Sequence, residues 1–452
     1  MVGVGRQNAL SDESVPGVNP TIEEWVARKD KFRVMSEGLP MPPFAVEKRY
    51  IRCLHPKHDE KNARNVLVVC TLSTDTRSWL SAARAVSRLL ESHKVDEVAG
   101  KVQVEIRNTN ELYADVSRVL PNNPTLIDAL TSIRGDIFKI ASEQMRDVVT
   151  SITFHMRVNW QHKHNDDVPG KPTVIVYCKP GSTCNFDKVE EEMLKTLDKI
   201  PPELEIHLEF LRGEIKLLAG YGEPIPEYLR EITPKPRNGA SIGVEGRTDE
   251  AGTLGGWLIL NLPKERREIC CALTCYHVVR SVDKTIRDYT DTHGVSLDDH
   301  GSHVVIEYPA AQDARYTMRT LGSLMSNPAI GRVVLASGYS VRDNSRMDWA
   351  LIESPSTFTV NRPTPAENLD TKFIMEDTTC YNLTTDSKVR EFGRVHLGDW
   401  VLKTERTIKT TSGDINALPR INVNWPSGLV TDEIEILSHS GTLQHQGIRD
   451  RW

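Results

Sequence analysis

Two stretches in the first half of the chain repeat the same order of hydrophobic patterns. Residues 65–70 form an apolar run that predicts a buried strand, a helical stripe follows, and residues 102–106 read as a second strand. Residues 173–177, another helical stripe and residues 204–210 repeat this order, which suggests an internal duplication. The first stripe consists of Trp79, Leu80, Ala83, Val86, Leu89 and Leu90, and the second of Val189, Met193, Leu194, Leu197 and Ile200.

Two further elements are predicted between these copies. Apolar residues at helical spacing indicate an amphipathic helix, and a later stretch alternates between apolar and polar residues as a half-buried strand does. Together with the copies they predict an α/β sandwich over residues 61–232. The helix face consists of Leu126, Leu130, Ile133, Ile137 and Ile140, and the strand face of Ile152, Phe154, Met156 and Val158.

The pattern changes on both sides of this α/β region. Residues 1–60 are rich in proline, glycine and charge, with one short amphipathic piece over residues 22–34, and they predict a flexible N-terminal arm. The proline-rich residues 233–240 predict a linker. From residue 241 to residue 452, short β-rich runs alternate with turn residues and no strong helical stripe occurs, which predicts a sandwich or barrel.

Charge and composition exclude several classes of function. The net charge is −6 and the basic residues are scattered, so no clustered electropositive face for nucleic acid is expected. No signal-peptide pattern occurs at the N-terminus and no apolar run could span a bilayer, so we expect a cytoplasmic protein without membrane association. The eight cysteines have no paired metal-ligand spacing, so we expect them to be mostly reduced and buried.

Two residues in the β-rich half have positions suited to chemistry. His277 follows a predicted strand in Cys-Ala-Leu-Thr-Cys-Tyr-His-Val-Val, and Asp348 opens the apolar run Met-Asp-Trp-Ala-Leu-Ile. A carboxylate at the start of a buried strand must be paired or solvated. An imidazole is a suitable partner, because the carboxylate selects its tautomer and stabilises the imidazolium. A structural histidine and a turn aspartate are the alternatives. Cys275 is interpreted as a packed small residue in apolar surroundings, without a base to ionise it.

The two motifs together resemble a known family. A strand that ends in Leu-Thr-x-x-His-Val, with Asp-x-Ala-Leu about seventy residues later, resembles the trypsin-like domains of the chymotrypsin superfamily, the PA clan. The Gly-Thr-Leu-Gly-Gly and Leu-Ala-Ser-Gly segments are similar to those of intracellular, fungal-type members. The resemblance implies a chymotrypsin-like double β-barrel that hydrolyses peptide bonds in peptide or protein substrates. It implies His277 and Asp348 as catalytic residues, with no cofactor and no metal.

The resemblance also implies a nucleophile that the chain does not contain at the expected place. In the family, a Gly-Asp-Ser-Gly segment supplies the serine and the oxyanion hole. The preceding strand pair has a degraded counterpart from Val401 to Gly413, with Glu405 and Lys409 where glycines are common, and the chain then ends in Gly-Ile-Arg-Asp-Arg-Trp. We therefore expect an incomplete barrel and an inactive chain. Ser440 is the nearest substitute, but it lacks the Asp-Ser-Gly context.

Three other functions remain open. The β-rich half could be a non-catalytic, protease-derived scaffold, with the α/β half binding a protein partner. The turn from Pro180 to Cys184 could hold an anion at a helix N-terminus, although an ordinary capped loop is the alternative. His162 and His164 with the nearby Asp166 and Asp167 could bind zinc, although a solvated loop explains them as well.

The last six residues fit a one-base frameshift. The codons GGT GAT TCG GGA TCG TTG G encode Gly-Asp-Ser-Gly-Ser-Leu, and deletion of the third base leaves codons for Gly-Ile-Arg-Asp-Arg-Trp, the sequence from Gly447 onward. Sequencing the transcript across the Gly447 codon is expected to reveal Asp-Ser-Gly in the mature message. If no neighbouring frame encodes Asp-Ser-Gly, the frameshift hypothesis is wrong.

Overall fold

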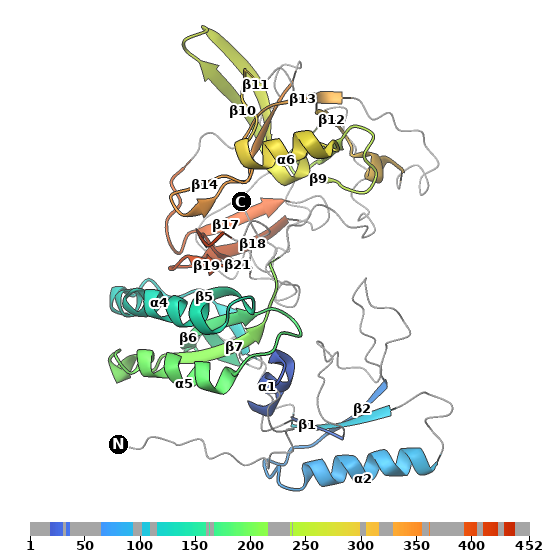
Figure 1. The fold of residues 1–452 in the computed structure, drawn as a ribbon, viewed down its shortest axis with the longest axis vertical. Coiled ribbons are helices and arrows are strands. Elements are labelled where there is room, and N and C mark those ends of the chain that lie inside the picture. The colour runs from blue at the N-terminus through green and yellow to red at the C-terminus, as the bar shows by residue number, and fades with distance from the viewer. Residues whose placement is uncertain are drawn as a thin grey trace. The chain divides into compact units, whose positions relative to one another are not determined.

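The chain divides into two compact units, both rich in β-strands. A computed structural model describes residues 19–29, 33–36, 65–93, 102–108, 115–159, 162, 167–215, 236, 238–298, 304–315, 329–354, 361, 393–404, 410–423 and 429–438. Unit 1 comprises residues 1–215 and 420–428, and unit 2 comprises residues 216–419 and 429–452. Figure 1 labels their elements.

A small three-stranded sheet with one helix forms the first part of unit 1. Its strands β1 (Arg33–Met35), β3 (Val102–Arg107) and β2 (Asn65–Cys70) lie in that order, and α2 (Trp79–Ser92) packs its Trp79 and Ala83 against Val104 and Ile106 of β3. The expected strand, helix and strand are therefore confirmed. The expected burial is wrong at Leu67, Val69 and Leu89, which are exposed.

The second sheet of unit 1 repeats this connection. Strand β6 (Lys171–Cys178), α5 (Phe186–Leu197), the 3₁₀ turn η3 (Pro202–Leu204) and β7 (His207–Arg212) follow one another, and β6 pairs with β7 in parallel, as β2 does with β3. Both copies are thus right in topology, while a duplication in ancestry stays a hypothesis. Strand β5 (Val149–Asn159) pairs antiparallel with β6 and with β4 (Asp115–Arg118).

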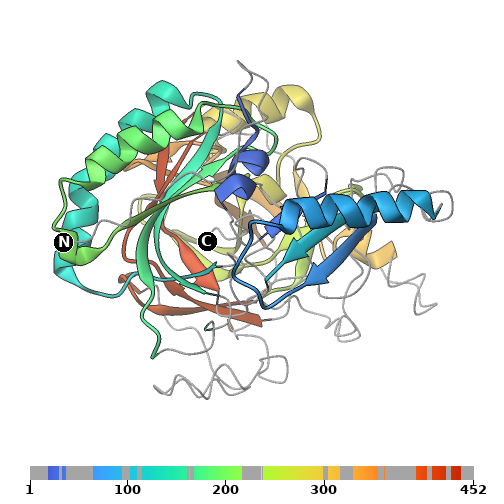
Figure 2. The same ribbon diagram turned by 90° about the horizontal axis from the view of Figure 1, so that it is seen from below.

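Helices α4 (Pro124–Gln144) and α5 cover one face of this sheet, as Figure 2 shows. Side chains at helical spacing fill the interface, because each helix buries one stripe. Asn123 and Asn185 cap the two helices by accepting hydrogen bonds from Leu126 N and Lys188 N. The buried residues of the helices are Leu126, Leu130, Ile133, Ile137, Ala141, Phe186, Val189, Met193, Thr196 and Leu197, whereas Leu194 is exposed.

The polar face of β5 is also buried. Its alternation predicts one face towards the core and one towards water, but Ser151, Thr153, His155 and Arg157 are all buried together with the apolar set. Buried polar groups must find hydrogen-bond partners, and Arg157 pairs with Glu209 of β7 at 3.0 Å between Nε and Oε2. The expected solvated face is therefore wrong.

Part of the predicted flexible arm belongs to unit 1. Residues Ile22–Lys29 form α1, in which Trp25 is 3% exposed and lies against Phe186 and Phe210 with ring centroids 5.6 and 5.2 Å away. The Trp25 indole N–H donates to Asp187 Oδ1 at 3.0 Å. The prediction of a flexible arm is wrong for this segment. Its short amphipathic pattern over residues 22–34 was visible in the sequence, but such a pattern does not show which surface the helix packs against, and the buried tryptophan contributes much of the packing area.

A strand from the C-terminal part of the chain completes unit 1. Strand β19 (Arg420–Asn422) pairs antiparallel with β5, with Ile421 opposite Ile152. The predicted continuous domain over residues 241–452 is therefore interrupted at residues 420–428. Of the predicted linker over residues 233–240, the described part of the chain includes four residues, namely 236 and 238–240.

A curled seven-stranded sheet dominates unit 2. Its order is β10-β11-β16-β13-β12-β8-β9, so the last strand, β9, connects directly to the first, β10, through Leu254 and Gly255. Gly255 N donates to Leu273 O of β11, and Thr274 Oγ1 donates to Thr253 O of β9. These bonds bring the two ends of the sheet together as a half-barrel. The strands are β8 (Ser241–Val244), β9 (Gly252–Thr253), β10 (Gly256–Leu262), β11 (Arg267–Thr274), β12 (Val305–Glu307), β13 (Ala329–Ala336) and β16 (Ala350–Glu353).

Unit 2 contains several smaller elements. Strands β14 (Val341–Arg342) and β15 (Ser345–Arg346) form a hairpin, and β17 (Trp400–Thr404), β18 (Thr410–Ile415) and β21 (Ile436–Ser438) form a three-stranded sheet, with β20 (Thr431–Glu433) before β21. The strand pair expected between residues 401 and 413 is thus confirmed. Helix α6 (Lys284–His293) was not expected. Among the described residues, no helix is both long and apolar enough to cross a membrane.

Replacement of Trp25 tests whether α1 is a structural part of unit 1. We expect Trp25→Ala to lower the free energy of unfolding of unit 1 by about 3–5 kcal/mol, because a large buried side chain is lost. Leu72→Ala, at a residue that is 78% exposed, is the control and should change little. Hydrogen exchange of the full chain measures the destabilisation by Trp25→Ala as a loss of protection of the backbone amides in α5 and β7. Equal protection in both variants would contradict the packing of α1.

Candidate active site

His277 sits in a short turn at the end of a buried strand. Strand β11 ends at Thr274, Cys275 is extended, and Tyr276–Val278 form the 3₁₀ turn η5. Tyr276 is 1% exposed, and its hydroxyl donates to Asp291 Oδ1 at 2.9 Å and lies 2.7 Å from Thr290 Oγ1. Because Thr290 and Asp291 belong to α6, this unexpected helix anchors the turn that carries His277.

The register of two strands brings Asp348 to the same place. Strands β11 and β16 are antiparallel with Thr274 opposite Ala350, so residues just after 274 and just before 350 lie at the same end of the pair. Trp349 N donates to Ser337 Oγ at 2.9 Å and Ser337 N donates to Trp349 O at 2.9 Å, which holds the chain just after Asp348. Met347 N donates to Ser340 O at 2.8 Å, which holds the chain just before it. The positions of both residues thus follow from backbone pairing.

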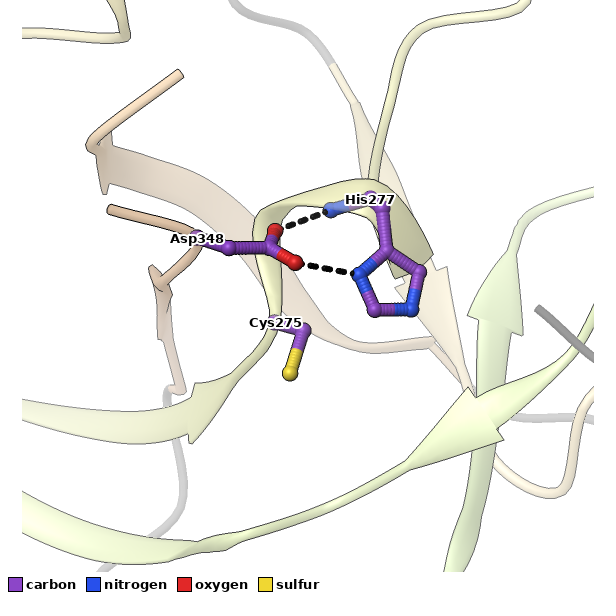
Figure 3. Close-up of side chains that lie close together, drawn as sticks. All are labelled: Cys275, His277 and Asp348. Carbon is purple, nitrogen blue, oxygen red and sulfur yellow. Dashed lines mark hydrogen bonds and ion pairs between the residues drawn. The ribbon is translucent and has the colours of Figure 1, made fainter. Parts of the chain in front are cut away.

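Asp348 holds His277 at two points, as Figure 3 shows. Its Oδ2 lies 2.6 Å from Nδ1 of the imidazole, and its Oδ1 accepts a hydrogen bond from the His277 backbone N–H at 2.9 Å. The two side chains are 14% and 8% exposed, so the contact is shielded while the imidazole is still reached by solvent. The carboxylate therefore sets both the tautomer and the orientation of the ring.

Opposing effects act on the ionisation of Asp348. Burial raises the pKa of its carboxyl, but the hydrogen bond and charge of His277, the backbone N–H of His277 and the charge of Arg346 lower it, and the net pKa is below the usual value. Asp348 is therefore ionised at neutral pH. The guanidinium of Arg346 lies 3.9 Å from the ring centroid of Tyr339, whose pKa burial raises to about 12.

A glycine is required next to the histidine turn. A Cβ atom on Gly252 would lie 2.3 Å from Cγ2 of Val278, the residue after His277, which is far inside contact distance. Strand β9 can therefore approach η5 only because residue 252 has no side chain. This explains the first glycine of the Gly-Thr-Leu-Gly-Gly segment in physical terms.

Cys275 is the residue whose setting differs most from expectation. It does pack against the core of unit 2, as expected. However, its Sγ, a ligand nitrogen of His277 and a carboxylate oxygen of Asp348 all lie within 4.8 Å of one another, so the expectation that no base is near is wrong (Figure 3). The signal in the sequence was the two-residue spacing between Cys275 and His277. Cys275 is extended and directly precedes the tight turn of Tyr276–Val278, so its side chain stays beside that of His277.

Ser440, the candidate substitute for the nucleophile, lies outside the described residues, as do all residues from 439 to 452. Within the described part, the strands that lead towards this segment are ordered as a sheet, with β18 between β17 and β21. The interpretation of Ser440 as a poor substitute thus stays a prediction.

The predicted anion site is filled by a residue of the chain itself. In the turn from Pro180 to Cys184, Gly181 N donates to the Glu23 carboxylate at 3.1 and 3.2 Å. The turn therefore fixes α1 and has the role of an ordinary structural loop. Of the predicted zinc ligands, His164 and Asp166 lie outside the described residues, so that site stays untested.

A buried contact between a serine and a histidine occurs in unit 1. Ser117 Oγ lies 2.8 Å from His155 Nδ1, and Thr153 Oγ1 lies 3.0 Å from His155 Nε2. Arg157 also donates to Ser117 Oγ at 3.0 Å. His155 is 1% exposed and both of its ring nitrogens contact side-chain hydroxyls, so this group satisfies the buried polar face of β5.

No protein-family model matches the chain, and no curated protein matches it significantly.

Asp348→Asn tests the electrostatic contact by its pH dependence. The folded-state pKa of Asp348 is depressed, so its stabilising effect is present above the unfolded value of about 3.9 and is lost as pH falls through the lower folded value. At pH 7 the free energy of unfolding of the wild type should be about 1.5–3 kcal/mol higher than that of Asp348→Asn, because hydrogen bonds to a charged group are lost. Urea unfolding from pH 7 to pH 3 should show this difference shrink below about pH 4. A difference that is independent of pH would contradict the assignment.

Proposed function

We propose that this protein is a serine endopeptidase-like protein of chymotrypsin-like architecture, with His277 as general base and Asp348 as the residue that orients it. The observation that carries the proposal is the two-point contact of one carboxylate with Nδ1 and the backbone N–H of the same histidine. A structural histidine needs only one such bond. Here the backbone N–H bond positions the carboxylate, and the positioned carboxylate orients the ring through Nδ1 as proton transfer requires.

The proposed chemistry follows from the tautomer. With the proton on Nδ1 bound to Asp348, the neutral imidazole carries its lone pair on Nε2. Nε2 takes the proton of a serine hydroxyl as the oxygen attacks the peptide carbonyl, and the imidazolium then gives that proton to the leaving amine. Asp348, ionised at neutral pH, stabilises the imidazolium without accepting its proton.

The curled sheet of unit 2 supports the architectural half of the proposal. Its two ends meet beside the turn that carries His277, and Asp348 enters from the next strand of the same sheet. The sheet of β17, β18 and β21 would belong to the second barrel, which supplies the serine in the family that the sequence resembles. Substrates are peptides or proteins, and the proposed reaction needs no cofactor.

Labelling by a fluorophosphonate probe tests the proposal. A variant chain is produced in which Asp-Ser-Gly-Ser-Leu follows Gly447 in place of residues 448–452, and we expect covalent labelling of its serine. His277→Ala should reduce the labelling rate by at least about 10³-fold, because the base is lost. His293→Ala, which removes an exposed histidine of α6, is the matched control and should label at the wild-type rate.

Two outcomes would overturn the proposal. Absence of labelling in a folded chain that contains Asp-Ser-Gly would favour a non-catalytic, protease-derived interaction protein, in which the α/β half binds a protein partner. Equal labelling of wild type and His277→Ala would mean that another residue activates the serine. Circular dichroism of each variant separates loss of chemistry from loss of fold.

A further inference from the structure

Three chemically different metal ligands converge at the end of β11. Cys275 and His277 are two residues apart on the same strand and turn, and Asp348 comes from the antiparallel neighbour. One thiol sulfur, one ring nitrogen and one carboxylate oxygen lie within 4.8 Å of one another (Figure 3). All three side chains are partly exposed, so the group can be reached from solvent.

We propose that Cys275, His277 and Asp348 form a binding site for a zinc-class divalent cation. Zinc and its relatives cobalt and cadmium accept sulfur, nitrogen and oxygen donors in one tetrahedral shell. A thiolate and a carboxylate together neutralise the charge of a dication, and three protein ligands leave a fourth position for water. The set of donors is therefore complete for an open three-ligand site.

Binding requires a small, specific rearrangement. Two ligand atoms of a tetrahedral zinc lie about 3.3 Å apart for nitrogen and oxygen, and about 3.6 Å apart for sulfur and nitrogen. The Nδ1 and Oδ2 atoms are closer than this, at 2.6 Å, so their hydrogen bond must open as the metal enters. The cysteine rotates inward, and Oδ1 of Asp348 can keep its bond to the His277 backbone N–H.

The metal would switch off the base. Coordination at Nδ1 leaves the remaining ring proton on Nε2, so the nitrogen that should accept the serine proton becomes a donor. Cys275 makes this possible, since the histidine and aspartate alone would offer only two ligands. This inhibitory consequence rests on the proposed function, whereas metal binding itself does not.

Cobalt titration of the full-length chain tests the site directly. Co²⁺ is added to reduced, metal-free protein, and we expect one thiolate-to-cobalt charge-transfer band that Zn²⁺ abolishes by competition. Cys275→Ala should lose the band and bind at least about 100-fold more weakly, because a ligand is removed. Cys270→Ala, at a partly buried cysteine of the same strand, is the matched control and should keep the band.

Further variants keep the test decisive. Cys275→Ser retains the shape of the side chain, and its circular dichroism separates loss of a ligand from loss of the fold. Asp348→Asn should keep the thiolate band at lower affinity. A band of equal intensity and affinity in wild type and Cys275→Ser, or no band in folded wild type, would overturn the metal site.

The metal site and the proposed function can fail separately. In the chain that contains Asp-Ser-Gly, Zn²⁺ should slow fluorophosphonate labelling of wild type, and Cys275→Ser should resist this inhibition by at least about 100-fold in zinc concentration. A cobalt band without any labelling would leave the metal site standing and refute the peptidase. Labelling without a cobalt band would support the peptidase and refute the metal site.

Discussion

The antiparallel pairing of β11 with β16 is the constraint on which the candidate site depends. It sets Thr274 opposite Ala350, and the turn after one strand then meets the segment before the other. A shift of the strand register by one residue would turn every side chain of the strand to the opposite face. The core of unit 2 and the contact between His277 and Asp348 therefore depend on the same register. The carboxylate then contacts His277 through two hydrogen bonds, one to Nδ1 of the ring and one from the backbone N–H.

The strongest sequence predictions concern elements with a regular apolar period. The helices α2, α4 and α5, the strands on either side of α2 and of α5, and the strand before His277 all follow from such periods, whereas the parallel pairing of the strands was not predicted. The contact of His277 with Asp348 is predicted because both motifs occur at a spacing typical of one family.

Other features could not be predicted because their signals are not periodic. Helix α6 has few buried residues, yet Asp283 caps its start and Gly294, with φ of 74°, ends it. The burial of β2 and the polar face of β5 were misjudged, because burial depends on which other elements cover a strand. The convergence of Cys275 with the other two ligands needed the actual turn geometry.

Strand β19 constrains the order in which unit 1 can fold during synthesis. The ribosome makes β5 before residue 160, but its partner at residues 420–422 emerges only after most of the chain, on the order of tens of seconds later at about 5–20 residues per second. Until then one stretch of the β5 edge has open backbone hydrogen-bonding groups, which invite pairing with another nascent chain. Unit 1 can therefore begin to fold early, but it reaches its final sheet only when synthesis is nearly complete.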